Sequence, residues 1–278
     1  MPRNTPEFFF KRTFIAISLT LLAILGSWFW NPTLGWAEMH VGLYLGTNFG
    51  LNTNPRWEAR KYAATEIRPQ TARRYGFPPL TFPAFTAQNI SIEPSVMVGG
   101  KFGYWFSREG ALKSNYPSFM KYFGLELDIS YHALNWSRQG VVISPTGYAM
   151  QIKNNGFMVT TAYLVMARYG FLPDKEVPFG RLQPYIGIGP TIVFTKTNLN
   201  IGPDYQSSEG DYPGLMVETG LRYMVRKNFS INPEFKYRYL RAHVDADARV
   251  FGMRYPLYAP MWTTYNLFSF SLGVAYHF

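Results

Sequence analysis

The chain of 278 residues contains no cysteine, and only 16% of its residues are charged, against roughly 25% in ordinary soluble domains. The missing cysteine excludes a disulfide scaffold, a thiolate metal site and a cysteine nucleophile. Aromatic residues reach 18%, which argues against disorder. The mean hydropathy of −0.11 is too low for a helical membrane bundle. It suits a membrane β-barrel, in which half of each strand faces a polar interior.

The N-terminus has the layout of a secretory signal peptide. Arg3, Lys11 and Arg12 form a positive region, and an apolar segment follows over residues 14–25. Small residues then stand at the −3 and −1 positions of a cut before Glu38. We therefore expect a signal peptide over residues 1–37 and a barrel domain over residues 38–278. An uncleaved helical anchor is the alternative, because the uncharged run over residues 13–30 is just long enough to span a bilayer.

Alternation of apolar and polar residues dominates the rest of the chain. Residues 123–131 place Phe, Leu, Leu, Ile and Tyr on one face and Gly, Glu, Asp and Ser on the other. The same period predicts eight strands, at residues 41–48, 92–106, 123–131, 157–169, 186–194, 215–223, 229–239 and 268–278. A soluble sandwich or barrel would also alternate, so other features must distinguish the two classes.

Two features favour a barrel in a membrane. The gaps between the predicted strands alternate between longer and shorter, as long external loops and short periplasmic turns would. If both termini are periplasmic, aromatic residues of the apolar face collect at that end of the strands, as a membrane-interface girdle does. They are Tyr104, Phe106, Phe123, Tyr169, Tyr223, Phe229, Tyr276 and Phe278.

The polar face carries acids and bases in equal numbers. An eight-stranded barrel has an interior that side chains just fill, and enclosed charges must be paired because an isolated one is costly. We therefore predict an ion-pair network in the lumen, made of Glu93, Lys101, Glu126, Asp128, Arg168, Glu218, Arg222, Glu234, Lys236 and Arg238. A solvated face with mixed charges is the alternative interpretation of the same residues.

The signal peptide, the eight amphipathic strands and the terminal phenylalanine resemble those of small Gram-negative outer-membrane β-barrel proteins, of the OmpA type and the outer membrane protein β-barrel domain families. The resemblance is clearest in the last strand, where Leu272, Val274, Tyr276 and Phe278 are similar to the C-terminal signal that the barrel assembly machinery reads. Residues 233–239 resemble a penultimate strand of such families. The resemblance implies an all-β, eight-stranded antiparallel up-and-down transmembrane barrel, integral in the outer membrane.

The longest gap, over residues 50–90, is basic. Six bases there meet two acids, Glu58 and Glu66. On an outer face these bases would contact lipopolysaccharide phosphates, although a plain solvated loop explains them equally well. The bases are Arg56, Arg60, Lys61, Arg68, Arg73 and Arg74. Nucleic acid is not an expected partner, because a secreted barrel would not meet it.

Motifs of catalysis are missing. The sequence has no H-E-x-x-H, phosphate loop, dinucleotide fingerprint or G-x-S-x-G. His243 follows the seventh predicted strand, and outer-membrane lipid A deacylases carry a catalytic histidine near a strand end. Their His-x-Ser-Asn element is not matched, since Asp245 stands where the serine would be. We therefore expect no catalytic residue, metal or cofactor.

The leading hypothesis is a monomeric, non-enzymatic barrel with a structural and surface-interaction role in the cell envelope. A narrow channel for ions or small hydrophobic molecules, as in OmpW-like barrels, is the alternative. A lipid A-modifying outer-membrane enzyme is the second alternative. The expected partners are outer-membrane lipid, lipopolysaccharide and the barrel assembly machinery.

Overall fold

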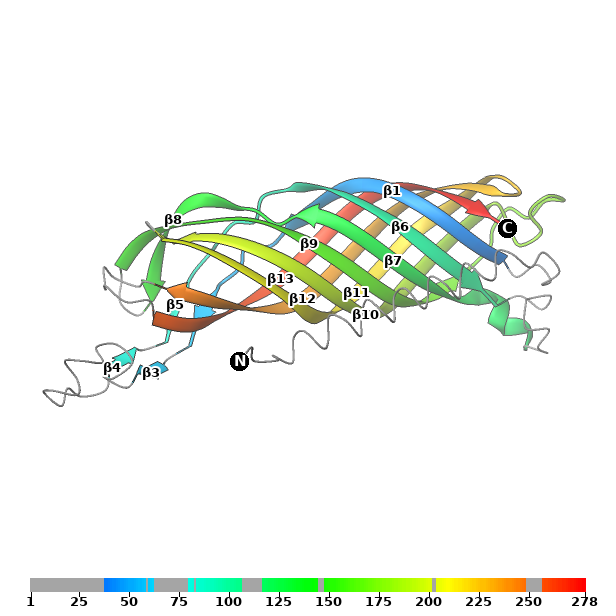
Figure 1. Cartoon of the computed structure of the whole chain (residues 1–278). Helices are drawn as coiled ribbons and strands as arrows, with labels where there is room; N and C mark the ends of the chain where they lie inside the picture. The colour runs from blue at the N-terminus through cyan, green and yellow to red at the C-terminus, as the bar shows by residue number, and fades with distance from the viewer. Residues whose placement is uncertain are drawn as a thin grey trace, which may run out of the picture.

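A computed structural model describes residues 38–58, 60–62, 80–82, 84–106, 117–144, 148–201, 204–248 and 257–278. The signal peptide predicted over residues 1–37 lies outside these ranges. Thirteen strands and one short 3-10 helix are described (Figure 1). They are β1 Glu38–Gly50, β2 Arg56–Trp57, β3 Arg60–Tyr62, β4 Leu80–Phe82, β5 Phe85–Ala87, β6 Ser95–Trp105, η1 Ser118–Tyr122, β7 Phe123–Ala133, β8 Trp136–Ser144, β9 Tyr148–Arg168, β10 Leu182–Ile201, β11 Asp204–Arg226, β12 Phe229–Ala248 and β13 Leu257–His277.

Eight of these strands form a closed antiparallel ring in the order β1, β6, β7, β9, β10, β11, β12 and β13. The last strand pairs with the first, from His40 opposite His277 to Gly50 opposite Leu267. This closure leaves no open edge among the eight strands, as a bilayer requires. The structure confirms the predicted eight-stranded antiparallel up-and-down barrel. We call the end that holds Glu38 and Phe278 the terminal end, and the opposite end the loop end.

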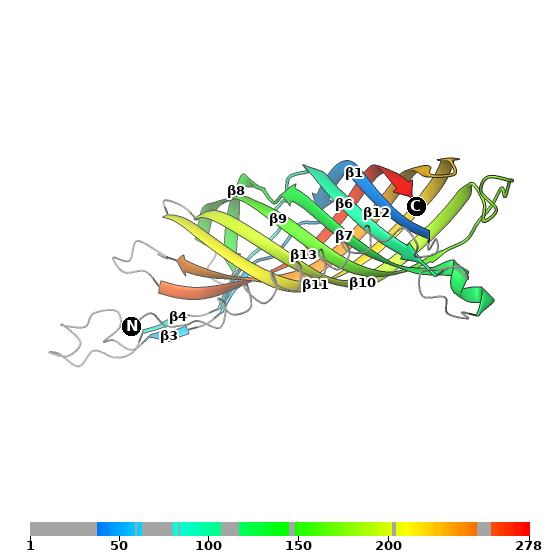
Figure 2. The same ribbon diagram turned by 45° about the vertical axis from the view of Figure 1, so that its right-hand side comes forward.

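The strands have two different lengths. Strands β1, β6 and β7 have 13, 11 and 11 residues, close to the roughly 9–11 that cross a bilayer. Strands β9 to β13 have 20 to 23 residues, about twice that length. The longer five therefore extend beyond the shorter three at the loop end, where β8 lies (Figures 1 and 2) and where β5 pairs with it (Figure 1).

Three short strands close the barrel wall where β1, β6 and β7 end. Strand β13 pairs with β2, β2 with β5, β5 with β8, and β8 with β9. Together with β9 to β13 they make a second ring of eight strands on the loop-end side of the first. We call the first ring, which contains β1, β6 and β7, the lower ring, and the second ring the upper ring. Single bridges between Thr53 and Ile90 and between Ile92 and Trp136 link the two levels.

The predicted loop between residues 194 and 215 is wrong. Strands β10 and β11 continue as paired strands up to Ile201 and Asp204. The prediction failed because the extension carries polar residues on its outer face, so the alternation used to define the strand stops while backbone pairing continues.

The aromatic girdle is present at the terminal end, where Tyr122 stacks on Tyr169 with ring centroids 5.7 Å apart and Tyr276 contacts Phe278 at 5.1 Å.

Among the described residues, no helix is long and apolar enough to cross a membrane.

Candidate functional site: the layered barrel interior

The two rings have opposite polarity. In the lower ring, the outward side chains are apolar, such as Leu43 and Leu272, which are 68% and 60% exposed. In the upper ring, a cluster of apolar side chains points inward, and many outward side chains are polar, such as Lys196, Glu209 and Arg241. A barrel in lipid needs the first arrangement, and a barrel in water needs the second. The change of polarity therefore marks the upper limit of the membrane-facing wall.

Nine of the ten residues predicted for the lumen are buried inside the lower ring. They are Lys101, Glu126, Asp128, Arg168, Glu218, Arg222, Glu234, Lys236 and Arg238. The tenth, Glu93, is exposed and lies before β6 begins at Ser95. Its placement in the lumen is wrong, because Pro94 precedes the strand and the phase of alternation changes there: Ile92, not Glu93, is the buried residue.

Two lysines bind all four carboxylates of the lower ring. The Lys101 Nζ lies 3.0 Å from Glu126 Oε1 and 2.9 Å from Glu234 Oε1, and it also contacts Glu218. The Lys236 Nζ lies 2.6 Å from Asp128 Oδ2. It is also 3.7 Å from Glu218 Oε2 and 3.5 Å from Glu234 Oε2. Each lysine therefore meets several carboxylates, and each carboxylate meets at least one lysine, as burial of these groups requires.

Tyrosines complete this network. The Tyr44 hydroxyl donates to Asp128 Oδ1 at 2.8 Å, while Lys236 Nζ lies 3.5 Å from the centre of the same ring. The Tyr185 hydroxyl donates to Glu234 Oε1 at 2.8 Å. Gly99 and Gly220 leave the space for these rings, since a Cβ at either position would lie within 2.6 Å of tyrosine atoms. The glycines of the strands thus allow two large side chains to cross the interior.

Arg238 occupies the next layer towards the loop end and binds neutral groups. Its Nη2 donates to Asn48 Oδ1 and to Ser269 Oγ, both at 2.6 Å. Its Nη1 lies 3.4 Å from Ser130 Oγ and 3.5 Å from Thr160 Oγ1. A guanidinium with several donors can bridge four strands in this way. The structure thus gives Arg238 amide and hydroxyl partners in place of the acid that the sequence predicted.

The two other arginines of the predicted network, Arg168 and Arg222, both lie near the ring of Trp105 at the terminal end. The Arg168 guanidinium lies 4.2 Å from the centre of the Trp105 ring, and that of Arg222 lies 5.5 Å away. Arg168 Nη1 also donates to Gln183 Oε1 at 3.1 Å. The sequence predicts both arginines as partners of lumen acids and gives the tryptophan no place among them. The sequence does indicate where Trp105 points, because it lies an even number of residues after Lys101 and therefore faces the same side of the strand.

An apolar plug fills the upper ring. Its buried members are Trp57, Ala87, Ile90, Ile92, Leu134, Trp136, Ile152, Met158, Val193, Leu199, Leu240, Ala242, Met261, Tyr265 and Leu267. They come from β9, β10, β12 and β13 and from the segments that close the second ring, and Tyr212 of β11 packs against them. The plug was not predicted from the sequence. Its signal is a pair of adjacent apolar residues where the apolar side chains change from the outward to the inward face, as at Tyr239–Leu240 and at Leu267–Phe268.

Three carboxylates of the network lie close enough to suggest a metal site. Oxygens of Glu126, Asp128 and Glu218 all lie within 4.8 Å of one another. Lys101 Nζ contacts both glutamates and lies 4.0 Å from Asp128 Oδ2. The ammonium group of Lys101 therefore balances the charge of these carboxylates, as a metal ion at this place would.

His243, the histidine considered for catalysis, packs on the outer side of the upper wall. Its ring lies 4.5 Å from that of Trp262, and its backbone carbonyl accepts a hydrogen bond from the Tyr212 hydroxyl. Trp262 also contacts the Arg241 guanidinium at 4.5 Å and donates to Glu58 Oε1 at 2.6 Å. The histidine thus belongs to an aromatic and basic cluster on the outside of the barrel.

The basic residues of the first loop are only partly described. Arg56 is exposed in β2, directly opposite Trp262 of β13. Arg60 and Lys61 lie in β3, which pairs with β4. Arg68, Arg73 and Arg74 lie outside the described residues. Arg56, Arg241 and Trp262 thus form a surface, here called the upper basic cluster, on the outside of β2, β12 and β13.

The residues of the C-terminal signal face outward from β13. Leu272, Val274, Tyr276 and Phe278 are 60%, 45%, 51% and 39% exposed. The backbone N–H of Phe278 donates to the Met39 carbonyl at 3.0 Å. The last residue therefore extends the seam between β13 and β1 by one hydrogen bond beyond the strand.

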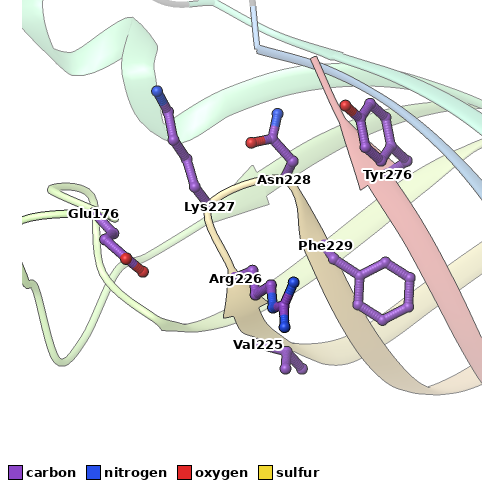
Figure 3. A pocket seen from close by; sticks show the side chains of 7 residues that line it. All are labelled: Glu176, Val225, Arg226, Lys227, Asn228, Phe229 and Tyr276. Carbon is purple, nitrogen blue, oxygen red and sulfur yellow. The ribbon is translucent and has the colours of Figure 1, made fainter.

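A groove lies outside the terminal end of the barrel (Figure 3). It has a volume of about 950 Å³, and Val225, Phe229 and Tyr276 supply its apolar wall. Arg226, Lys227 and Asn228 contribute polar groups, and Glu176 reaches it from the turn between β9 and β10. A rim of aromatic and basic side chains is typical of the interface between hydrocarbon and headgroups.

Comparison with known families decides the classification. The family model for the outer membrane protein beta-barrel domain matches residues 80–278. The chain belongs to this family. The outer-membrane β-barrel is thereby established as its class. No curated protein matches the sequence significantly.

Several solved structures are similar to this outer-membrane barrel. OprG from Pseudomonas aeruginosa is 14% identical, with a TM-score of 0.46, and the match covers 88% of this chain and 98% of that one. The N-terminal β-barrel domain of Pseudomonas aeruginosa OprF is also 14% identical, with a TM-score of 0.36 and coverage of 88% and 99%. The outer membrane protease OmpT from Escherichia coli is 9% identical, with a TM-score of 0.43 and coverage of 87% and 97%. Likeness at this level assigns no specific role.

Proposed function

We propose that this outer-membrane barrel is a plugged, non-enzymatic protein with a structural and surface-interaction role in the cell envelope. The filled interior carries the proposal. From the terminal end upward, the lumen holds the arginines around Trp105, the lysine–carboxylate network, the Arg238 layer and the apolar plug. The cavity beside Lys101 and Arg222 has a volume of only about 10 Å³, roughly the space of a single water. A continuous path for solutes is therefore not expected.

Surface interaction is assigned to the loop end. We propose that the terminal end faces the periplasm, so that the upper ring projects outward from the membrane. The upper basic cluster then meets lipopolysaccharide, whose phosphates bind guanidinium groups well. Arg56 and Arg241 both lie beside Trp262, on the wall just above the apolar belt. This position supports contact with phosphates at the base of the lipopolysaccharide layer.

The test is lipopolysaccharide binding by the refolded protein. We expect the double variant Arg56→Gln, Arg241→Gln to bind several-fold more weakly, because charge-assisted contacts to phosphate are lost. Lys121→Gln is the control, since Lys121 is an exposed base of η1 at the terminal end. Equal affinities of wild-type protein and double variant would contradict the assignment. Mass spectrometry of lipid A from cells with and without the protein tests the enzymatic alternative, and we expect identical lipid A.

Residues 1–37 are proposed to be removed as a signal peptide. The structure starts its first strand at Glu38, so a cut before this residue would leave the barrel intact. N-terminal sequencing of the membrane-extracted protein tests the proposal. A chain that begins at Met1 would contradict it and would favour a helical anchor.

A further inference from the structure

A β-bulge at the terminal end of β11 turns a basic side chain to the outside of the barrel. The even-numbered residues Arg222 and Met224 of this strand face the lumen and are 2% and 3% exposed. Strict alternation would place Arg226 inside with them. The register with β12 shifts between Met224 and Arg226, however, so that Arg226 lies opposite Phe229, whose ring faces outward. Arg226 is exposed, and the bulge therefore places its guanidinium on the outer side of the wall.

Two aromatic rings continue this level across the next strands. Phe229 of β12 is the register partner of Arg226 on one side and of Tyr276 of β13 on the other. Phe229 and Tyr276 are 38% and 51% exposed, and they belong to the apolar outer face of the lower ring. One base and two rings thus lie side by side at the edge of the lipid-facing wall. This is the level at which the hydrocarbon of a bilayer meets its headgroups.

The groove of about 950 Å³ at this level combines an apolar wall with positive charge (Figure 3). Val225 adds to the apolar wall, and Lys227 adds a second base. The acid that lines the groove, Glu176, is already paired, because its Oε2 lies 2.8 Å from Arg181 Nη2. Within the described part of the chain, no carboxylate lies in ion-pair distance of Arg226 or Lys227. The groove therefore offers two bases without an acid beside an apolar surface.

We propose that this groove binds an anionic phospholipid by its phosphate and one acyl chain. The phosphate lies at Arg226 and Lys227, where its oxygens accept charge-assisted hydrogen bonds from both bases. The acyl chain follows the apolar wall and removes it from water. Because the acid of the groove is neutralised by Arg181, the site favours a headgroup with a net negative charge over a zwitterionic one. The choice of a phospholipid rests on the proposed orientation, in which the terminal end faces the periplasm.

The test is native mass spectrometry of the folded protein, titrated in detergent micelles with phosphatidylglycerol and, separately, with zwitterionic phosphatidylcholine. We expect one saturable site that prefers phosphatidylglycerol. In the double variant Arg226→Gln, Lys227→Gln its dissociation constant should rise at least about tenfold, because each base near a headgroup strengthens binding several-fold. The matched control is Lys121→Gln, Lys175→Gln, which removes the same charge from two exposed bases of the terminal end that do not line the groove. Its dissociation constant should stay within about twofold of the wild-type value.

A second pair of variants tests the apolar wall. Phe229→Ala should weaken binding several-fold, because contact with the acyl chain is lost. Phe123→Ala makes the same change at a ring of similar exposure on β7, outside the groove, and should leave binding unchanged. Heat-modifiable mobility checks that each variant folds. If the double variant does not fold, Lys227→Gln alone replaces it, with an expected weakening of several-fold.

Three results would overturn the proposal: a wild-type protein that binds neither lipid, equal affinity for the two lipids, or a double variant with wild-type affinity. The variant Arg56→Gln, Arg241→Gln should bind phosphatidylglycerol normally. Failure of the proposed lipopolysaccharide contact and failure of this site would therefore be observed in different variants and with different ligands.

Discussion

Lys236 of β12 and Asp128 of β7 meet across the centre of the barrel, with Nζ and Oδ2 2.6 Å apart and side chains no more than 1% exposed. Neither strand neighbours the other in the ring. The ion pair therefore links opposite walls of the barrel. Its contribution to the stability of the protein can be measured with substitutions that leave the backbone pairing of the strands intact.

We expect Lys236→Met to lower the free energy of unfolding by about 3–5 kcal/mol, because Asp128 loses its closest partner inside the barrel. The double variant with Asp128→Asn should recover part of this loss, since the uncompensated charge is removed. Urea unfolding in lipid vesicles measures both. The control is Lys196→Met, whose pair with Glu209 is 2.9 Å long but largely solvent-exposed, with an expected cost of about 0–1 kcal/mol. Equal losses at the two lysines would contradict the enclosed network.

The apolar plug should contribute to stability as a soluble core does. Trp136 is fully buried, and its ring lies 6.5 Å from that of Tyr265. We expect Trp136→Ala to cost about 3–5 kcal/mol, again by urea unfolding. Val142→Ala is the comparison, because Val142 belongs to the same short strand β8 and is 59% exposed. A cost for Trp136→Ala no larger than that of the comparison would show that the upper ring is not packed.

Deletion of Phe278 should impair insertion. It removes an outward aromatic ring and the hydrogen bond from its N–H to Met39, and we propose from the family resemblance that the assembly machinery reads this residue. Phe278→Ala separates the two effects, because it keeps the backbone bond. We expect both variants to reach the outer membrane poorly, and the deletion to be the worse. Heat-modifiable mobility and membrane fractionation report the result, with Phe119→Ala as a control at an exposed aromatic of η1. Normal insertion of the deletion variant would contradict the role of the seam.

The turn between β9 and β10 has its own pH dependence. Asp174 Oδ1 accepts hydrogen bonds from the N–H groups of Val177 and Glu176, at 2.7 and 2.9 Å, and Arg181 contacts Oδ2. The hydrogen bond from Val177 first, and then that from Arg181, lowers the pKa of Asp174 below its ordinary value of 3.8. Because the pKa is lowered on folding, the stabilisation is complete above this ordinary value and is lost as the pH falls through the lowered pKa.

We therefore expect limited proteolysis at the turn to remain slow down to about pH 4 and to accelerate only under more acidic conditions, with an acid-stable protease as the probe. Asp174→Asn should raise the rate of cleavage wherever Asp174 is ionised in the wild-type protein, and should remove the acid-dependent rise. Lys175→Gln is the neighbouring control. A wild-type cleavage rate that rises already near neutral pH would contradict the assignment.

The membrane-facing half of the barrel could be predicted because a bilayer imposes one rule on every strand there. Outward positions must be apolar and inward charges must be enclosed, so the alternation along each strand was enough to place Glu126, Asp128, Glu218 and Lys236 inside. Alternation shows which way a side chain points, but it does not show which residue that side chain contacts. It could not tell that Lys101 meets three glutamates while Arg238 binds Asn48 and Ser269.

The upper half of the barrel was missed because it lies outside the bilayer, where outward positions are no longer required to be apolar. Beyond Tyr239 and before Phe268 the apolar phase moves to the inward side, and a pattern sought in one phase ends at these residues. Glu93 failed for a related reason, since Pro94 interrupts the count of alternate positions before β6. Strands β2 and β5 carry too few residues to show any period, and the sequence of β8, WSRQGVVIS, does not alternate between apolar and polar residues. Their place follows from pairing with distant strands, which one sequence does not reveal.

The central claim is that the barrel interior is closed by packed side chains, and single-channel recording in a planar lipid bilayer tests it most directly. Purified protein that shows the heat-modifiable mobility of a folded barrel is reconstituted at low density, and the current is recorded across a range of voltages and salts. We predict a current equal to that of the protein-free bilayer under every condition. Reproducible conductance steps of uniform size would contradict the account and establish the barrel as a channel.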